Sequence, residues 1–308
     1  MRMNGLWNIV RRMAEALPHW REAKKKVENP RLIMTLLVKN EEEKLEANLY
    51  FHHAMGVDGF IVTDNNSSDS TMSIIQQYKQ KGWILEVIEE PSTGYEQKAW
   101  VDRMIQLARK RYQADWIINA DADELWYAPS GSLKAELANC RGNIAHCQIR
   151  SMSPEADKPF YQWNQRVEFV QDQQAYGLSS YSMFGRQRGK AAHRSDGYIQ
   201  IGMGNHKVRM LPSCLVESPI RIYHYNMGTR DQFMKKMIQG GRELEQHNSR
   251  HGGAHWRYFY GLHKEGRLSE EYDKVIGNNQ WERLVADGYI VEDNTIGEYF
   301  SNHIQMAE

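Results

Sequence analysis

The pattern of apolar positions along the chain changes after Pro30. From there, short continuous apolar runs alternate with segments in which apolar residues recur every three or four positions. The continuous runs predict strands buried on both faces of a parallel sheet, and the periodic segments predict helices. The predicted strands are residues 31–38, 59–63, 83–88 and 115–119. The predicted helices are residues 42–55, a segment that begins near residues 67–69, and a helix around residues 100–107. A loop at residues 91–94 precedes the last of these helices. This alternation predicts an α/β domain with right-handed crossovers.

The second half of the chain is less regular. A long polar stretch, residues 151–206, is where we expect loops that meet an acceptor. Strand-like pieces are residues 144–150, 207–211 and 220–225, and helical pieces are residues 229–246, 256–264 and 280–286. We therefore expect an N-terminal helix in residues 1–29, an α/β domain in residues 30–228 and a helical extension in residues 229–308.

The N-terminal segment has the pattern of a basic amphipathic helix. Its apolar residues are Leu6, Trp7, Ile9, Val10, Met13 and Leu17, and its basic residues are Arg11, Arg12, Arg21 and Lys24 to Lys26. Such a helix packs on its domain or lies on a membrane surface. No apolar run is long enough to span a bilayer, and no signal peptide is evident. The expected location is cytoplasmic, with a peripheral position at the inner face of the membrane as the second interpretation.

Composition narrows the function classes. The 308 residues carry 39 basic and 39 acidic side chains, so a nucleic-acid partner is not expected. The three cysteines, Cys140, Cys147 and Cys214, are odd in number and lack C-x-x-C spacing. This argues against a disulfide scaffold or zinc knuckle and favours a reducing compartment.

Polar clusters follow three of the predicted strands where each strand ends. They are Asn40-Glu41, Asp64-Asn65 and the run from Asp121 to Glu124. Ligands of open α/β sheets bind at the carboxyl ends of the strands. The three clusters therefore predict a site at one edge of the sheet.

Asp121 and Asp123 form a D-x-D pair directly after a buried strand. Two such carboxylates can hold a hard divalent ion, Mn²⁺ or Mg²⁺, which would neutralise the charge on a departing diphosphate. The alternative is a solvated acidic turn or a helix cap. Glu124 is expected to support the ligands or to contact the sugar.

Carboxylate and amide groups at Asp64 and Asn65 suit the ribose hydroxyls and base edge of a nucleotide. An Asx turn with a helix cap explains the same residues equally well. Asn40 and Glu41 form an analogous cluster. Lys98, Arg103 and Arg188 are candidates for contacts with phosphate, although exposed basic residues usually contact only water.

The ordered set of motifs resembles the family-2 glycosyltransferases, in particular the family-2-like branch related to family 92. The residues that carry the resemblance are Val38 to Glu41, Gly56 to Asp58, Asp64 to Asp69, Asp121 to Glu124, Ile222 to Tyr225 and Asp231 to Lys236, within residues 31–245. The resemblance implies the GT-A fold, one Rossmann-like α/β domain. It also implies donor binding by Asn40, Glu41, Asp64 and Asn65, metal binding by Asp121 and Asp123, and inversion at the anomeric carbon.

Two further roles follow from that chemistry. A neutral histidine can complete the metal shell, and His224 is preferred to His206 because its motif matches the family better. An inverting transfer needs a carboxylate base, for which Asp196 in the polar stretch is the first candidate. Glu155, Asp157, Glu168 and Asp172 are the other candidates.

The function expected from the sequence is transfer of a sugar from a UDP-sugar, or a GDP-sugar, to a saccharide or lipid-linked acceptor, in surface polysaccharide or lipopolysaccharide synthesis. A haloacid-dehalogenase-type phosphatase also has D-x-D after a strand, but normally after its first strand. A non-catalytic nucleotide- or sugar-binding protein is the alternative outside enzymes. Neither G-x-S-x-G nor H-E-x-x-H occurs, which argues against serine and zinc hydrolases.

Overall fold

The computed structural model describes residues 2–17, 27–91, 96–246 and 253–304, and the chain folds into two compact units. The first comprises Met1–Ile149, Arg188–Ile222 and Ile304–Glu308, and the second comprises Arg150–Gln187 and Tyr223–His303. Residues 150–187 thus group with the C-terminal helices, whereas the sequence prediction placed them with residues 30–149. Each unit is described by itself.

The first unit is built on a sheet with strand order β8-β4-β1-β2-β3. Its strands are β1 (Leu32–Val38), β2 (Gly59–Asp64), β3 (Ile84–Glu89), β4 (Trp116–Ala120) and β8 (Lys190–Arg194). The first four are parallel, and β8 runs antiparallel to β4. Strand β6 (Ile144–Met152) continues the sheet beside β8, β11 (Leu215–His224) pairs with β5 (Glu124–Tyr127) and β6, and β9 (Tyr198–Ile201) pairs with β10 (Val208–Met210).

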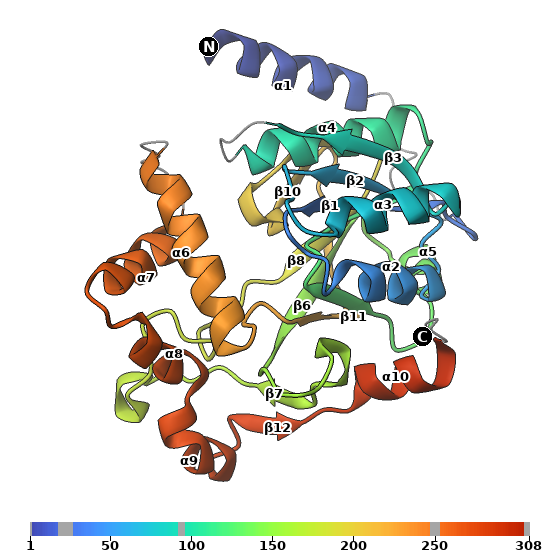
Figure 1. The fold of residues 1–308 in the computed structure, drawn as a ribbon. Helices are drawn as coiled ribbons and strands as arrows, with labels where there is room; N and C mark the ends of the chain where they lie inside the picture. The colour runs from blue at the N-terminus through green and yellow to red at the C-terminus, as the bar shows by residue number, and fades with distance from the viewer. Residues whose placement is uncertain (1, 18–26, 92–95, 247–252, 305–308) are drawn as a thin grey trace. The chain divides into compact units, whose positions relative to one another are not determined.

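Helices cover both faces of the parallel strands (Figure 1). Helix α4 (Gln97–Lys110) packs on one face, where Ile33, Ile61 and Ile117 join its apolar side in one cluster. Helices α2 (Leu45–Ala54) and α3 (Thr71–Gln80) lie on the other face, and α5 (Leu133–Ala138) follows β5. The predicted α/β class is confirmed, but the sheet as a whole is mixed: β1 to β4 are parallel, and the strands that continue it through β8, β6 and β7 (Gln165–Val167) are antiparallel. Residues 92–94 of the predicted loop lie outside the described residues.

Helix α1 (Arg2–Ala16) is anchored to the rest of the first unit by an arginine. The guanidinium of Arg12 donates to both carboxylate oxygens of Asp102 on α4, at 2.7 and 2.6 Å, and to the carbonyl of Ile199 at 2.8 Å. Trp7, Val10 and Leu17 are exposed, while Arg21 and Lys24 to Lys26 lie outside the described residues. No helix among the described residues is both long and apolar enough to cross a bilayer.

The second unit has a core of its own, formed mainly by helices. They are α6 (Arg230–Gln246), α7 (Ala254–Lys264), α8 (Leu268–Ile276), α9 (Trp281–Ala286) and α10 (Thr295–His303), with β7 (Gln165–Val167) pairing with β12 (Ile290–Glu292). Phe184, Phe233 and Phe259 are among the buried residues of this core. The helices predicted at residues 229–246, 256–264 and 280–286 correspond to α6, α7 and α9.

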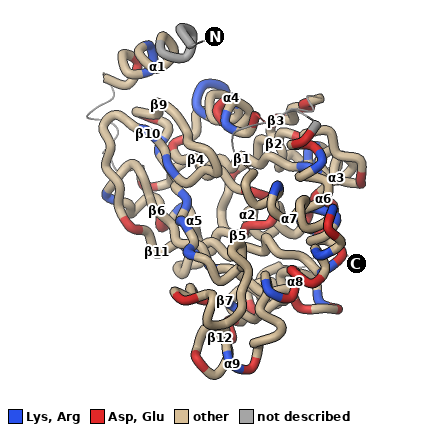
Figure 2. The backbone as a smooth tube through the Cα atoms, turned by 90° about the vertical axis from the view of Figure 1, so that its left-hand side faces the viewer, with Lys and Arg blue, Asp and Glu red and all other residues tan. Residues whose placement is uncertain are grey.

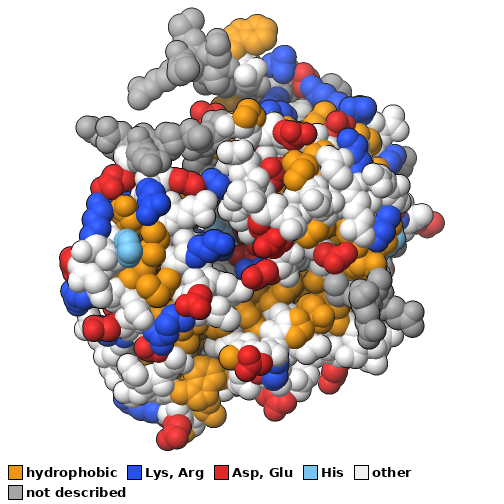
Figure 3. All heavy atoms as spheres, viewed as in Figure 1, with side chains coloured by type: hydrophobic (Ala, Val, Ile, Leu, Met, Phe, Trp, Pro, Cys, Tyr) orange, Lys and Arg blue, Asp and Glu red, His pale blue; other side chains and the backbone are white. Residues whose placement is uncertain are grey.

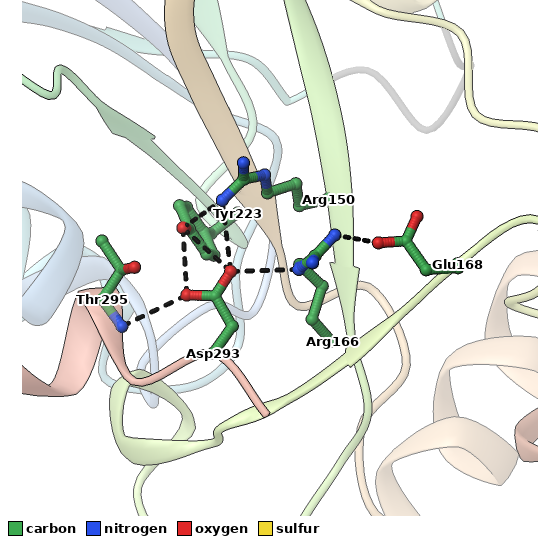
Figure 4. A network of polar contacts seen from close by, with 6 residues as sticks. All are labelled: Arg150, Arg166, Glu168, Tyr223, Asp293 and Thr295. Carbon is green, nitrogen blue, oxygen red and sulfur yellow. Dashed lines mark hydrogen bonds and ion pairs between the residues drawn. The ribbon is translucent and has the colours of Figure 1, made fainter. Parts of the chain in front are cut away.

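Asp293 joins several elements of the second unit (Figure 4). Its carboxylate pairs with Arg150 of β6 at 3.2 Å and Arg166 of β7 at 3.0 Å. It also accepts hydrogen bonds from the Tyr223 hydroxyl at 3.2 Å and from the backbone N–H of Thr295, the first residue of α10, at 3.2 Å. One nearly buried carboxylate thus fixes the start of α10 and neutralises charge on two arginines.

Acidic and basic positions are interspersed rather than gathered by sign. The backbone tube in Figure 2 shows both signs on most helices, and Figure 3 shows blue and red side chains mixed over the face drawn.

Helices α6 and α7 pack closely at Gly241, and we expect Gly241→Ala to lower the free energy of unfolding by roughly 1–3 kcal/mol. A Cβ at Gly241 would lie 2.2 Å from the Cβ of Tyr260, so the helices would have to move apart. Gly261→Ala, on α7, is the matched control because a Cβ there meets no atom within 4 Å. Urea denaturation should show the control unchanged or stabilised by up to about 1 kcal/mol; equal stabilities of the two variants would contradict the expectation.

Candidate active site

The three polar clusters lie at one edge of the sheet of the first unit. Strands β2, β1 and β4 are neighbours, with Val38 opposite Asp64 and Leu36 opposite Ala120. Adjacent strands are about 4.8 Å apart, so the ends of β2 and β4 are about 10 Å apart across β1. The sheet thus brings Asn40-Glu41, Asp64-Asn65 and Asp121 to Glu124 to one rim.

The loops after β1 and β2 are held together by the predicted donor-binding residues themselves. Asp64 accepts hydrogen bonds from the N–H and the hydroxyl of Ser67, at 3.1 and 2.5 Å. The N–H of Asn40 donates to the Ser67 hydroxyl at 2.9 Å, and the Asn40 side-chain oxygen accepts from the N–H of Ser68 at 2.8 Å. Asn40 has a φ of 54°, a left-handed conformation that asparagine tolerates. The side chains of Asp64 and Asn40 thus hydrogen-bond within these loops, while α3 has no side-chain cap at Ser70.

Glu41 and Asn65 complete the same pair of loops. The N–H of Glu41 donates to the Thr71 hydroxyl at 2.8 Å, where α3 begins. Asn65 is 7% exposed, and its side-chain amide donates to the Glu90 carbonyl at 3.3 Å. The backbone of these loops is thus fixed by hydrogen bonds, while contact of their side chains with a nucleoside stays a prediction.

Side chains of α2 form hydrogen bonds that fix the acidic turn after β4, residues 121–124. Strand β4 is buried throughout, and the side-chain amide of Asn48 donates to the carbonyls of Ala122 and Glu124, at 3.0 and 2.8 Å. The imidazole Nε2 of His52 accepts from the N–H of Trp126 at 3.0 Å. Both side chains are fully buried on α2, so the turn has one conformation imposed by the helix beneath it.

Burial differs sharply among the three carboxylates of the turn. The side chain of Asp121 is 35% exposed, whereas Asp123 is 5% and Glu124 0% exposed. One oxygen of Glu124 lies 3.3 Å from the N–H of Asp121 and 3.4 Å from the indole N–H of Trp126. Only Asp121 presents much of its carboxylate to solvent. Glu124, predicted to support the ligands or to contact the sugar, is enclosed by the protein.

Lys190, the first residue of β8, places a cation inside this turn. Its Nζ lies 2.7 Å from Asp121 Oδ2 and 2.5 Å from Glu124 Oε1, and its side chain is 3% exposed. Burial alone would lower the pKa of Lys190, but attraction by Asp121 and Glu124 outweighs it and raises that pKa above its usual value. Lys190 is therefore an ammonium ion that neutralises the buried Glu124. Sequence reasoning missed it.

Behind the turn, a buried polar chain crosses from β1 to β8. The Thr35 hydroxyl donates to Asn119 Oδ1 at 2.7 Å, and Asn119 Nδ2 lies 3.2 Å from His193 Nε2. His193 Nδ1 lies 2.9 Å from the carbonyl of Arg194, to which it donates. Each polar group has a partner, which makes this chain compatible with full burial.

His52 and His193 predict a loss of stability in acid. Burial lowers the pKa of His52 to about 3 and that of His193 to about 4, from the usual 6.5. Between these values and 6.5 the unfolded state binds more protons, so the free energy of unfolding falls as the pH falls, by about 1.4 kcal/mol per pH unit for each histidine. Urea denaturation of wild type and His193→Gln between pH 7 and 5 isolates one contribution: because this range includes the unfolded pKa of 6.5, the variant should lose about 2 kcal/mol less than wild type, and equal losses would refute the assignment.

The remaining predicted site residues are only partly brought together. His206 donates from Nδ1 to the carbonyl of Gly189 at 3.1 Å, beside Lys190; burial lowers its pKa, and the field of Asp121 opposes this. His224 ends β11 in the second unit. Lys98 lines a cavity of about 370 Å³ together with Arg12 and Asp102.

Asp196 lies at the opposite end of the sheet from Asp121. Because β8 is antiparallel to β4, Arg194 is opposite Trp116, and the N–H of Ser195 donates to the carbonyl of Asp115. Asp115 and Asp121 are separated by the whole of β4, which is about 17 Å of strand. The structure therefore does not bring Asp196 to the acidic turn, and we do not retain it as the base. The other candidates, Glu155, Asp157, Glu168 and Asp172, belong to the second unit.

The donor set of the turn suits a divalent ion that also takes ligands from a substrate. Within residues 2–17, 27–91, 96–246 and 253–304, no three His, Cys, Asp or Glu side chains are grouped closely enough to form a metal cage. Asp121 offers one oxygen that Lys190 does not occupy, with Asp123 two residues further on. Mg²⁺ and Mn²⁺ are commonly held by one or two carboxylates, waters and substrate phosphates, so the residues fit an ion that binds together with a diphosphate.

Comparison with known proteins identifies the family. The profile of glycosyltransferase family 92 matches residues 34–251, a range that contains β2, β3, β4, most of β1 and the acidic turn. The chain belongs to glycosyltransferase family 92. This glycosyltransferase accordingly has the GT-A type of α/β domain that the sequence predicted, and the haloacid-dehalogenase alternative is excluded. Among curated proteins, none matches the chain.

Solved structures offer only distant likenesses. TarS residues 1–349 from S. aureus is 11% identical, with a TM-score of 0.39 over 89% of this chain and 75% of that chain. The mannosyltransferase PcManGT from Pyrobaculum calidifontis, in complex with GDP-Man and Mn²⁺, is 14% identical, with a TM-score of 0.38 over 92% and 86%. At these TM-scores neither likeness carries an argument about the ligands of this glycosyltransferase.

Proposed function

We propose that this family 92 glycosyltransferase moves a sugar from a nucleoside-diphosphate sugar to a saccharide or lipid-linked acceptor, by a single displacement that inverts the anomeric carbon. UDP is favoured as the nucleotide and GDP is the alternative. The observation that carries the proposal is the position of Asp121, a partly exposed carboxylate at the rim where strands β1 and β2 also end.

Each part of the rim has a chemical task in this proposal. Asn40, Glu41, Asp64 and Asn65 position the nucleoside, and Asp121 with Asp123 binds Mn²⁺ or Mg²⁺ on the diphosphate. The bound ion supplies positive charge where negative charge develops on the leaving group. His224, with His206 as the alternative, adds a neutral nitrogen ligand, and the carbonyl of Gly189 beside Lys190 holds the ring of His206. The carboxylate base that an inverting transfer requires is left unassigned.

The setting we propose is polysaccharide or lipopolysaccharide assembly in the cytoplasm, at the inner face of a membrane. Exposed Trp7 and Val10 on α1, with Leu17 directly after it, support a peripheral contact, because apolar side chains on a basic helix bury in a headgroup region. Substitution of these three residues by serine should reduce sedimentation with anionic vesicles without changing nucleotide binding.

The experiment that tests the proposed function is calorimetric titration of UDP and GDP, with and without Mn²⁺. Wild type should bind one nucleotide more tightly when Mn²⁺ is present, and Asp121→Ala/Asp123→Ala should lose that metal-dependent part. Because Asp123 is buried, its substitution could disturb folding, and circular dichroism of the variant is the control for this. Absence of binding for both nucleotides under every condition would refute the donor site and favour a non-catalytic scaffold.

A further inference from the structure

Lys190 is a cation enclosed among the carboxylates of the acidic turn. Its ammonium contacts Asp121 and Glu124 at 2.7 and 2.5 Å and is almost inaccessible to solvent. A buried Glu124 requires such a counter-ion, but the second contact is not required by burial, since Asp121 is half-exposed. Lys190 therefore contacts a proposed metal ligand as well as a structural carboxylate.

The backbone gives Lys190 little freedom to move away. A Cβ at the preceding residue, Gly189, would lie 2.5 Å from the carbonyl oxygen of Cys147 and 2.4 Å from the ring of His146, so β8 runs close against β6 there. The carbonyl of Gly189 also accepts from His206 at 3.1 Å. The backbone at Lys190 is thus fixed against β6, and the two ion pairs hold its ammonium beside Asp121.

This contact changes the electrostatics of ion binding. A divalent ion that approaches Asp121 meets a carboxylate whose Oδ2 is already engaged and whose charge Lys190 partly neutralises. Repulsion between the ammonium and the ion acts over a few ångströms in a partly buried site, where it is weakly screened. A diphosphate brings negative charge to the same place, and its attraction for the ion offsets this repulsion.

We propose that Lys190 is an internal counter-ion and positioning residue that makes divalent-ion binding at Asp121 conditional on the diphosphate of the donor. The proposal rests on the proposed function for the identity of the diphosphate. In the absence of a nucleotide, Lys190 holds Asp121 and Glu124 in a charge-compensated arrangement. When the nucleotide binds, the exposed oxygen of Asp121 completes an ion site that the protein alone does not offer.

The test measures Mn²⁺ binding by the loss of the free-ion signal in electron paramagnetic resonance, with the full chain. Glu124→Gln and Lys190→Met/Glu124→Gln are the two variants compared, because they differ only in the ammonium. Glutamine keeps hydrogen-bonding groups near the N–H of Asp121 and the indole of Trp126 without a charge that needs Lys190. Lys207→Met, which removes an exposed cation elsewhere in the first unit, is the control for a general change of charge.

Without nucleotide, Lys190→Met/Glu124→Gln should bind Mn²⁺ at least about tenfold more tightly than Glu124→Gln, and Lys207→Met should equal wild type. With UDP or GDP present, the gain in Mn²⁺ affinity that the nucleotide confers should shrink by the same factor. Equal or weaker Mn²⁺ binding in the double variant would overturn the proposal and leave Lys190 with a structural role only. If wild type binds neither nucleotide, the proposed function fails, while the nucleotide-free comparison still decides the role of Lys190.

Discussion

Asp121→Asn should lower kcat/KM for sugar transfer by about 1,000-fold while leaving the protein folded. The change removes the charge of the most exposed carboxylate of the turn, and about 4 kcal/mol of transition-state stabilisation corresponds to that factor. Stability should change little, because Glu124 still neutralises Lys190 and the Asp121 side chain is partly solvated. Initial rates with a UDP- or GDP-sugar, over a range of Mn²⁺ concentrations, measure the effect.

Asp115→Asn is the matched control for this prediction. Asp115 lies at the other end of the same strand, where its carboxylate accepts from the N–H of Arg31 at 2.7 Å, an interaction that asparagine can keep. The control should retain nearly all activity. A similar loss in the two variants would mean that both act through the stability of β4, and full activity of Asp121→Asn would show that its charge is not used in the reaction.

Lys190→Met should cause the largest loss of stability, about 3–5 kcal/mol of unfolding free energy at neutral pH. It leaves Glu124 charged and without its ammonium counter-ion at a position with no exposure to solvent. Glu124 would respond by binding a proton, because its pKa in the folded variant would rise above its unfolded value. Since a raised carboxyl pKa favours the folded state only below that pKa, the variant should be least impaired in mild acid and more impaired as the pH rises.

The double variant Lys190→Met/Glu124→Gln separates lost charge pairing from lost packing. Removing both charges should recover most of the stability, because neither side chain then leaves an uncompensated ion in the interior. Urea denaturation of both single variants and the double variant gives the coupling energy between the two residues. A double variant as unstable as the sum of the singles would contradict the interpretation of this contact as a buried ion pair.

The sequence predicts the parallel part of the fold well because those strands obey a simple rule. Strands β1, β2 and β4 are buried on both faces and are continuous apolar runs, so their carboxyl ends, and with them Asp64 and Asp121, could be located from the sequence. Their alternation with α2, α3 and α4 determines that these ends share one edge. The site residues that follow strand ends could therefore be predicted from the sequence alone.

Strand β8 could not be found in this way, and with it the sequence missed Lys190. Residues Lys190, His193 and Arg194 make the segment polar, yet all are buried, because partners distant in sequence satisfy them. Lys190 contacts Asp121 across 69 positions and His193 contacts Asn119 across 74. Hydrophobic patterns do not reveal a strand whose burial depends on such pairing.

The position of Asp196, away from the acidic turn, has the same origin. In a polar stretch expected to be loops, Asp196 was free to lie near the acceptor. Once β8 is an antiparallel neighbour of β4, every step from Lys190 to Asp196 moves away from Asp121. The antiparallel direction of one strand therefore decides which carboxylates can serve the reaction.

The hydrogen bonds from α2 to the acidic turn determine at which stage the turn loses its conformational entropy. The amide of Asn48 already donates to the carbonyls of Ala122 and Glu124, and His52 already accepts from Trp126, so the conformational entropy of this segment is lost during folding rather than during donor binding. Because a preorganised turn loses little entropy when the donor binds, its contacts contribute more to affinity. It also places its carboxylate where charge develops. A substitution on α2, remote from any substrate, would thus weaken the enzyme by leaving the turn to be ordered only when the donor binds.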